Sequence, residues 1–248
     1  MATLRACFPA RRVSPSTRRA CSSEPGSPLA RILALDAALA RTSAAVVVDG
    51  ALAAQAIVDV DRGQSERLAV MAQSVLEEAA LWPDQLDAVA VTVGPGSFTG
   101  LRAALALAHG IAFGAGRPVV PVSLAEVFAE ALPRRGGRTL WTAIDSRRAR
   151  VFLDTGAGFH AVPLDALPAA QDPVAVAGDA AIAVAARLAT RGDDVMLSDA
   201  RLPWPRHVAC AAEKRLAGAL PPLAALPLYI DPPEARLPAG GLRPAPLR

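Results

Sequence analysis

The fold of this chain is decided by the stretch Val91-Thr-Val-Gly94-Pro95-Gly96-Ser97-Phe98-Thr99-Gly100-Leu101-Arg102. It begins as an apolar strand, turns through Gly-Pro-Gly, and continues into an Ala- and Gly-rich segment that predicts a helix over Phe98–Ala115. Gly94 and Gly96 allow other backbone to approach closely, and Ser97 is a residue type that caps helices. The exposed amide groups of such a helix start predict a site that favours an anion.

Neither generic nucleotide-binding motif accounts for this stretch. The dinucleotide fingerprint requires a glycine where Thr99 stands, and the Walker A motif requires Lys followed by Ser or Thr after Gly100. Gly100 is followed here by Leu and Arg. The glycines must therefore be explained in another way.

Strand and helix patterns alternate around this motif. Asp49-Gly50 lies between two apolar runs and is a strong hairpin signal. Trp82-Pro83 is expected to end the first long helix, and Ser123 to cap a later one. The first half is predicted to contain strands at residues 31–36, 44–48, 52–60, 86–93 and 119–122, and helices at residues 65–81, 98–115 and 123–132. This order predicts a mixed sheet with helices on its faces.

The second half shows a smaller version of the same pattern. The segment Pro133-Arg-Arg-Gly-Gly137 is typical of a linker between the two halves. Strands are expected beyond it at residues 139–144, 149–154, 174–176 and 194–197, and helices at residues 179–190 and 206–220.

Composition places the chain among globular proteins with an aliphatic core, because 52% of its 248 residues are hydrophobic and only 4% aromatic. The formal net charge is +3, but residues 1–28 carry five arginines against the single acid Glu24. Subtracting this +4 leaves −1 for the rest, which is not the basic footprint of a stand-alone nucleic-acid binder. The apolar run at 103–113 is shorter than the roughly 18 residues that span a bilayer.

Residues 1–29 form a segment of their own, rich in Arg, Ser and Pro. Three interpretations stay open: an organellar transit peptide, a disordered extension, or a start codon set too far upstream. We expect the segment to be disordered and dispensable, because its composition offers little apolar area to bury.

The three cysteines, Cys7, Cys21 and Cys210, have a spacing that fits neither a zinc site nor a disulfide framework. A reducing, cytoplasmic setting is therefore expected.

The string Gly-Pro-Gly-Ser-Phe-Thr-Gly-Leu-Arg, followed by an Ala- and Gly-rich helix, resembles the signature of the TsaB/YeaZ family. Other segments resemble the family in the same order, over residues 32–36, 64–68, 119–126, 143–148 and 228–233. The resemblance covers about residues 30–237.

This resemblance implies an α/β protein of the ASKHA (actin/Hsp70-like) fold, with two tandem RNase-H-like lobes whose mixed sheets are flanked by helices. The expected division is a disordered extension at 1–29, a first lobe at 30–137, a smaller second lobe at 138–237 and an irregular tail at 238–248.

The resemblance also implies a role. TsaB proteins are degenerate paralogues of TsaD, which transfers threonylcarbamoyl to the tRNA adenosine adjacent to the anticodon. We expect a non-catalytic subunit of the t6A transferase complex that forms a heterodimer with TsaD, is joined by the TsaE ATPase, and meets tRNA only through the complex. It is expected to bind no cofactor of its own, with ATP or ADP at the level of the complex, to form a homodimer when alone, and to have no membrane partner.

Two sets of residues follow from this. The partner interface is expected on the two long helices, at Leu68, Met71, Val75, Ala79, Arg102, Ala103, Leu107 and Gly110. The residues nearest to any nucleotide are expected to be Asp36, Gly94, Gly96, Ser97 and Thr99.

The chain departs from the family at two positions. Asp36 is followed by Ala37-Ala38, where relatives often carry Thr and Ser whose hydroxyls would face a phosphate. Gln64 replaces a histidine that is usual at the start of the first long helix. Asp36 is therefore interpreted as a strand-end acid bonded to loop amides.

Two enzymatic alternatives need residues that the sequence does not offer. An M22-like metallopeptidase needs two histidines about one helical turn apart, whereas His109, His160 and His207 are isolated. An ASKHA phosphotransferase needs a second glycine-rich phosphate hairpin, which the sequence Asp145-Ser-Arg-Arg148 does not supply.

Overall fold

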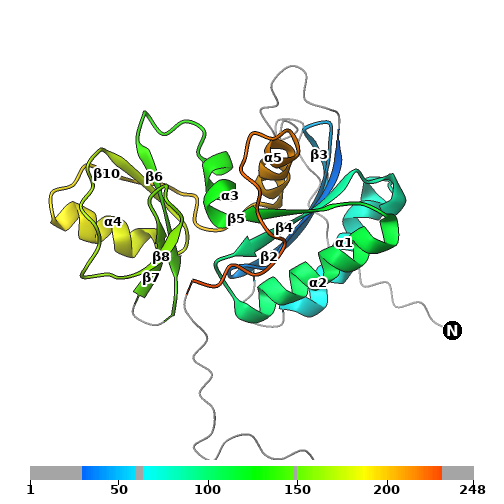
Figure 1. Ribbon diagram of the computed structural model, residues 1–248, viewed down its shortest axis with the longest axis horizontal. Helices are drawn as coiled ribbons and strands as arrows, with labels where there is room; N and C mark the ends of the chain where they lie inside the picture. The colour runs from blue at the N-terminus through cyan, green and yellow to red at the C-terminus, as the bar shows by residue number, and fades with distance from the viewer. Residues whose placement is uncertain (1–29, 60–63, 148–149, 231–248) are drawn as a thin grey trace, which may run out of the picture.

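Two five-stranded mixed sheets with one shared topology form the framework of the molecule (Figure 1). The computed structural model describes residues 30–59, 64–147 and 150–230. The first sheet has the order β3-β2-β1-β4-β5, and the second has the order β8-β7-β6-β9-β10. In each, three strands form an antiparallel meander and two more run parallel to the first of them. The expected fold of two tandem RNase-H-like lobes is confirmed.

The meander of the first sheet comprises β1 (Arg31–Asp36), β2 (Arg41–Val48) and β3 (Ala51–Asp59). Asp49 and Gly50 join β2 to β3, and their φ angles of 54° and 71° are the left-handed values that a two-residue hairpin turn requires. The hairpin predicted from the Asp-Gly pair is confirmed.

The rest of the first half alternates helices and strands: α1 (Gln64–Glu78), the short 3-10 helix η2 (Pro83–Gln85), β4 (Ala88–Gly94), α2 (Phe98–Ala115), β5 (Val119–Ser123) and α3 (Leu124–Ala131). Ser123 caps α3 as predicted. Its hydroxyl accepts from the amide of Glu126 at 3.3 Å, and its own amide donates to the Glu126 carboxylate at 2.8 Å.

The end of α1 differs from the prediction. The helix stops at Glu78, because Ala80 adopts a left-handed φ of 53° and the amide of Leu81 donates to the carbonyl of Leu76 at 3.0 Å. A left-handed residue in the last turn, rather than Trp82-Pro83, therefore ends this helix.

The second sheet contains β6 (Thr139–Asp145), β7 (Arg150–Asp154), β8 (Phe159–Pro163), β9 (Val174–Ala177) and β10 (Val195–Leu197), with α4 (Ala181–Thr190) on one face. The strand β8 was not predicted. It is a short edge strand whose residues are all exposed or half-buried, so its sequence lacks the buried run that identified the other strands.

Helices cover both faces of the first sheet. α1 and α2 enclose a core against one face, with Leu33, Val91 and Leu105 among its members. The opposite face is covered by α5 (Pro205–Leu216) together with Val127 of α3. Figure 1 shows α1 and α2 below this sheet and α5 above it. α5 thus follows the second sheet in sequence but packs on the first, and a lobe boundary near residue 137 stays a proposal.

Among the described residues, α2 is one helix that is long and apolar enough, by length and composition alone, to cross a membrane. The sequence analysis considered only the shorter run at 103–113. In the structure α2 lies on the first sheet, and Leu101, Ala104 and Ala108 are buried. Arg102 projects from its first turns and is exposed.

Cys210 of α5 is buried and disulfide-bonded. The spacing of the cysteines had indicated no disulfide framework. Spacing along a chain does not report which sulfurs the fold brings together, so that expectation is corrected.

Candidate functional site

The turn between β4 and α2 is closed by the chain itself. The amide of Ser97 donates to the carbonyl of Ala38 at 2.7 Å, and the Ser97 hydroxyl accepts from the amide of Gly100 at 3.2 Å, which caps α2 as predicted. A Cβ placed on Gly96 would lie 2.2 Å from the carbonyl oxygen of Ala38. One placed on Gly100 would lie 2.1 Å from the carbonyl oxygen of Ala37. The glycines therefore make room for the backbone of the β1–β2 loop.

This packing bears on the anion site expected at the start of α2, which stays a prediction. The loop at residues 37–38 lies against the N-terminus of α2. The carbonyl oxygen of Ala38 accepts a hydrogen bond from the amide of Ser97, which is one of the amides that an anion would need. The missing hydroxyls at Ala37 and Ala38 gave no signal of this closure, because the contacts are made by the backbone carbonyls of these residues. Thr99 lies on the exposed side of α2, and Gly94 is buried with a φ of 113°.

Asp36 lies beneath that loop at the end of β1 and is fully buried. Its Oδ1 accepts from the Thr92 hydroxyl at 2.6 Å and from the amide of Ala38 at 3.2 Å. Its Oδ2 is buried without a hydrogen-bond partner in the described chain. Burial raises the pKa of Asp36 to about 6, although the bonds from Thr92 and Ala38 lower it in part. The interpretation of Asp36 as a strand-end acid bonded to a loop amide is confirmed, and contact with a nucleotide stays a prediction.

The space between the two sheets is also filled. A cluster of buried hydrophobic residues joins the loop after β1, α2 and α3 to strands β6 and β9; it consists of Ala38, Leu39, Leu101, Leu124, Phe128, Ile144 and Ala177. Figure 1 shows α3 lying between the sheets. These packed apolar side chains occupy the space between the two sheets.

The corresponding turn of the second sheet is closed in the same way. A Cβ on Gly178 would lie 2.1 Å from the carbonyl oxygen of Ala143, and the Asp179 carboxylate accepts from the amide of Asp145 at 2.9 Å. Burial raises the pKa of Asp179, and the nearby Asp145 carboxylate adds to the rise. Within the described ranges, no group of three or more His, Cys, Asp or Glu could hold a metal ion.

The expected interface residues of α1 are not at the surface. Leu68, Met71 and Val75 are buried in the first core, and Ala79 packs against it. The expectation that they line an exposed face is wrong, because their stripe is the one that α1 turns toward the sheet. On α2, Arg102 and Gly110 are exposed, whereas Ala103 and Leu107 are half-buried.

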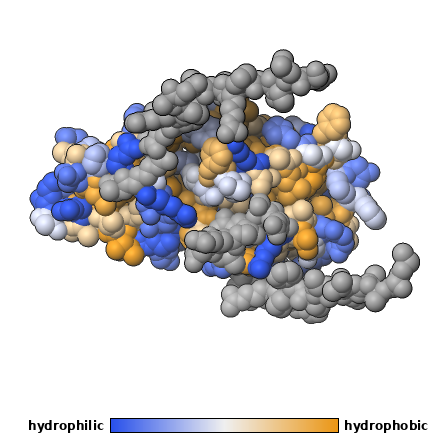
Figure 2. Space-filling model, turned by 90° about the horizontal axis from the view of Figure 1, so that it is seen from below, coloured by the Kyte–Doolittle hydropathy of each residue, from blue (hydrophilic) through white to orange (hydrophobic). Residues whose placement is uncertain are grey.

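An exposed, largely apolar face does exist on α2. Its members follow the helical repeat along the whole helix: Phe98, Arg102, Ala106, Gly110, Phe113 and Gly114. Phe113 is 91% exposed, and Trp82, in the segment after α1, is 74% exposed. Figure 2 looks from below, where α2 lies in Figure 1, and shows hydrophobic residues reaching the surface over the half that contains α1 and α2. Sequence reasoning missed Phe113 and Trp82.

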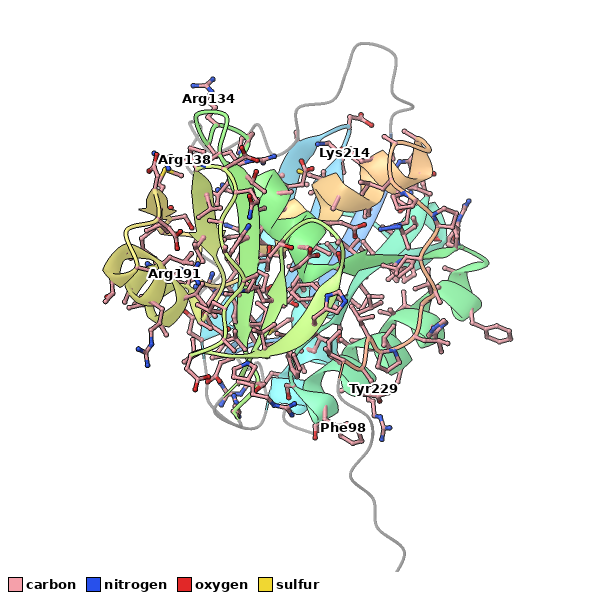
Figure 3. The ribbon with its side chains drawn as sticks, turned by 60° about the vertical axis from the view of Figure 1, so that its left-hand side comes forward. Phe98, Arg134, Arg138, Arg191, Lys214 and Tyr229 are labelled. Carbon is pink, nitrogen blue, oxygen red and sulfur yellow. The ribbon has the colours of Figure 1, made fainter. Side chains whose placement is uncertain are left out.

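A cluster of Phe98, Arg102 and Tyr229 marks the N-terminal end of this face. The Nε–H of Arg102 donates to the Tyr229 hydroxyl at 2.8 Å, and the guanidinium carbon lies 3.7 Å from the centre of the Phe98 ring. Figure 3 shows Phe98 and Tyr229 side by side at this end of the molecule. Tyr229 belongs to the segment at 221–230, which packs against the first core and crosses α2. The amide of Leu228 holds this segment by donating to the carbonyl of Val93 at 2.7 Å.

Comparisons with known proteins agree with this architecture. The family model described as TsaD, tRNA N6-adenosine threonylcarbamoyltransferase, matches residues 58–195. The tRNA threonylcarbamoyladenosine biosynthesis protein TsaB of Escherichia coli is 35% identical over 123 residues, which are 49% of this chain and 53% of that protein. The TsaB of Haemophilus influenzae is 37% identical over 37% of this chain and 39% of that protein. The matches thus span about half or less of these curated relatives.

A crystal structure from Pseudomonas aeruginosa, of an uncharacterized protein with similarity to peptidase YEAZ, superimposes with a TM-score of 0.68. The superposition covers 82% of this chain and all of that one, at 25% sequence identity. The fold and the closed turn together define a two-lobed ASKHA-type α/β protein. Within that class, the chain belongs to the TsaB/YeaZ family.

Proposed function

We propose that this protein takes part in the biosynthesis of tRNA N6-threonylcarbamoyladenosine as a non-catalytic subunit that binds the TsaD-type transferase. The observation that carries the proposal is the exposed apolar face of α2, in a molecule whose turn between β4 and α2 is closed by its own backbone. An apolar face of this kind usually marks an interface. TsaE is expected to join the pair, and tRNA and ATP are expected to be bound by the complex.

The closed turn between β4 and α2 favours the role of a non-catalytic subunit over that of a catalyst. Phosphoryl transfer relies on backbone amides and positioned carboxylates around the phosphates. In this chain the amide of Ser97 is used by Ala38, and Asp36 is sealed beneath the same loop. No observation favours the phosphotransferase or metallopeptidase alternatives over a binding role.

The helix composition supports α2 as the contact. Ala106, Gly110 and Gly114 are small, so a helix of the partner could approach closely, while Phe113 offers a large side chain for a pocket. Leu68, Met71 and Val75 of α1, which were expected at this interface, are buried in the core, so the proposed contact rests on α2.

The test is co-purification with the transferase of the same organism, followed by an assay of threonylcarbamoyl transfer to tRNA. We expect a stable complex on size-exclusion chromatography, transfer activity in the complex, and none with this chain alone. Transfer by the isolated chain, or the absence of any complex, would overturn the proposal.

A further inference from the structure

We infer that Arg102 is a recognition residue that binds a carboxylate of the protein partner at the N-terminal end of α2. This inference rests on the proposed function, since the partner is taken to be the TsaD-type transferase. It is carried by the geometry of the cluster formed by Phe98, Arg102 and Tyr229.

The guanidinium of Arg102 is held in place, and no acid among the described residues neutralises its charge. Nε–H donates to Tyr229, and the rings of Phe98 and Tyr229 lie 3.7 and 5.7 Å from the guanidinium carbon. The two rings are themselves 6.0 Å apart. In the described part of the chain, neither Nη1 nor Nη2 has a hydrogen-bond partner, and no carboxylate pairs with this arginine. The two terminal groups are thus free to bind a carboxylate with two parallel hydrogen bonds.

The surroundings indicate the sign of the ligand. Arg102 is the one residue of formal charge in α2, apart from the titratable His109, and the crossing segment at 221–230 contains no acid. A partner that covers the apolar face would also cover this guanidinium. A charge removed from water without a counter-charge is strongly unfavourable, so a fitting partner supplies Asp or Glu at this point.

The cluster is also separate from the basic residues elsewhere on the molecule. Figure 3 shows Arg134, Arg138 and Arg191 far from Phe98 and Tyr229. Arg138 and Arg191 have acidic partners at 2.6 and 2.7 Å, in Asp194 and Asp193. Arg102 therefore acts as a single fixed cation within an apolar face, and not as part of a basic patch for a polyanion.

The test measures the affinity of the transferase for wild-type protein and for three variants of this cluster, at 50 and 500 mM NaCl. Arg102→Gln is expected to weaken binding by at least about 30-fold, as for loss of one partner of a desolvated pair. Arg102→Lys keeps the charge but loses the planar fork and is expected to lie in between. Tyr229→Phe removes only the hydroxyl that orients Arg102 and should cost a few-fold. Binding of wild type, but not of Arg102→Gln, should weaken with salt.

Three controls separate the outcomes. Melting curves show whether Arg102→Gln keeps its fold. Asp231→Asn removes the acid nearest to Tyr229 in sequence and should leave affinity unchanged. Exchange of the one transferase Asp or Glu that pairs with Arg102 for Arg should weaken the affinity of the transferase for wild-type protein as much as Arg102→Gln does. The same exchange should not weaken affinity further when it is combined with Arg102→Gln. Equal affinity of folded Arg102→Gln and wild type would overturn this inference alone, whereas a wild type that fails to bind overturns the proposed function. Loss of a homodimer, with transferase binding intact, would assign Arg102 to self-association and overturn the inference as well.

Discussion

The hydroxyl of Thr92 donates to Oδ1 of Asp36 at 2.6 Å, while Oδ2 of the same fully buried carboxyl group has no partner in the described chain. Hydrogen bonds thus stabilise the negative charge at Oδ1 but not at Oδ2. Because burial outweighs the hydrogen bonds, the pKa is raised from 3.8 to about 6, and the folded protein binds this proton more tightly than the unfolded chain.

The first prediction concerns the pH dependence of this group. Its contribution is most favourable below about pH 4 and is lost as the pH rises through about 6, by up to about 3 kcal/mol. Asp36→Asn should remove this slope and should be at least as stable as wild type at pH 8. Denaturant unfolding from pH 4 to 8 measures it, with Asp59→Asn as the control at an exposed acid whose pKa is lowered by Arg41. A variant that is less stable than wild type at pH 8 would show that the carboxylate has a partner.

The second prediction concerns His207, which changes stability with pH in the opposite direction to Asp36. Burial, and then the positive charge of Arg206, lower its pKa from 6.5 to about 4. The stability linked to a neutral His207 is complete above pH 6.5 and is lost as the pH falls through about 4. We expect His207→Gln to remove this loss, so that the acids with raised pKa values, Asp36, Asp179 and Glu213, make stability rise on acidification between pH 6.5 and 4. The same titration checks it, and an unchanged slope would contradict it.

The third prediction tests the closed turn. Gly96→Ala should destabilise the protein by about 2–3 kcal/mol, because the new methyl group meets the backbone of Ala38 and not a flexible side chain. Gly110→Ala is the matched control, since a Cβ there meets nothing within 4 Å, and it should stabilise the helix by about 0.5–1 kcal/mol. Thermal melting of the isolated protein measures both. A Gly96→Ala variant as stable as wild type would mean that the loop after β1 moves easily.

The fourth prediction separates the core face of α1 from the exposed face of α2. Met71→Glu buries a charge among aliphatic side chains and should cost more than about 4 kcal/mol, so that the variant no longer folds stably. Phe113→Glu should change stability by less than about 0.5 kcal/mol but reduce affinity for the transferase at least about tenfold. Val70→Glu, at an exposed position of α1, serves as the charge control. Normal folding of Met71→Glu would restore α1 to the candidate interface.

Local signals explain what could be predicted from the sequence. The Asp49-Gly50 turn, the Ser97 and Ser123 caps and the strands other than β8 each depend on residues close together in the chain, and the structure has them where the patterns indicated. The apolar stripe of Leu68, Met71 and Val75 was also recognised. The sequence did not show whether this stripe faces the sheet or a partner protein, because residues that pack on either one have the same helical spacing.

Contacts between distant segments explain what could not be predicted. The closure of the turn joins Ala38 to Ser97, and the cluster on α2 joins Arg102 to Tyr229 across 127 residues of sequence. No spacing rule relates these pairs. The alanines after Asp36 showed that a phosphate contact was missing, but not that backbone had taken its place.

The position of α5 has a consequence for the order in which this protein can fold during synthesis. The first sheet leaves the ribosome early, yet the helix that covers one of its faces, Pro205–Leu216, is translated after the whole second sheet. Until then, the apolar side chains of that face, such as Ile32 and Val47, have no cover from this helix and are exposed to chaperones or to aggregation. A nascent chain arrested after residue 137 is therefore expected to be a chaperone substrate, and release should coincide with the emergence of α5.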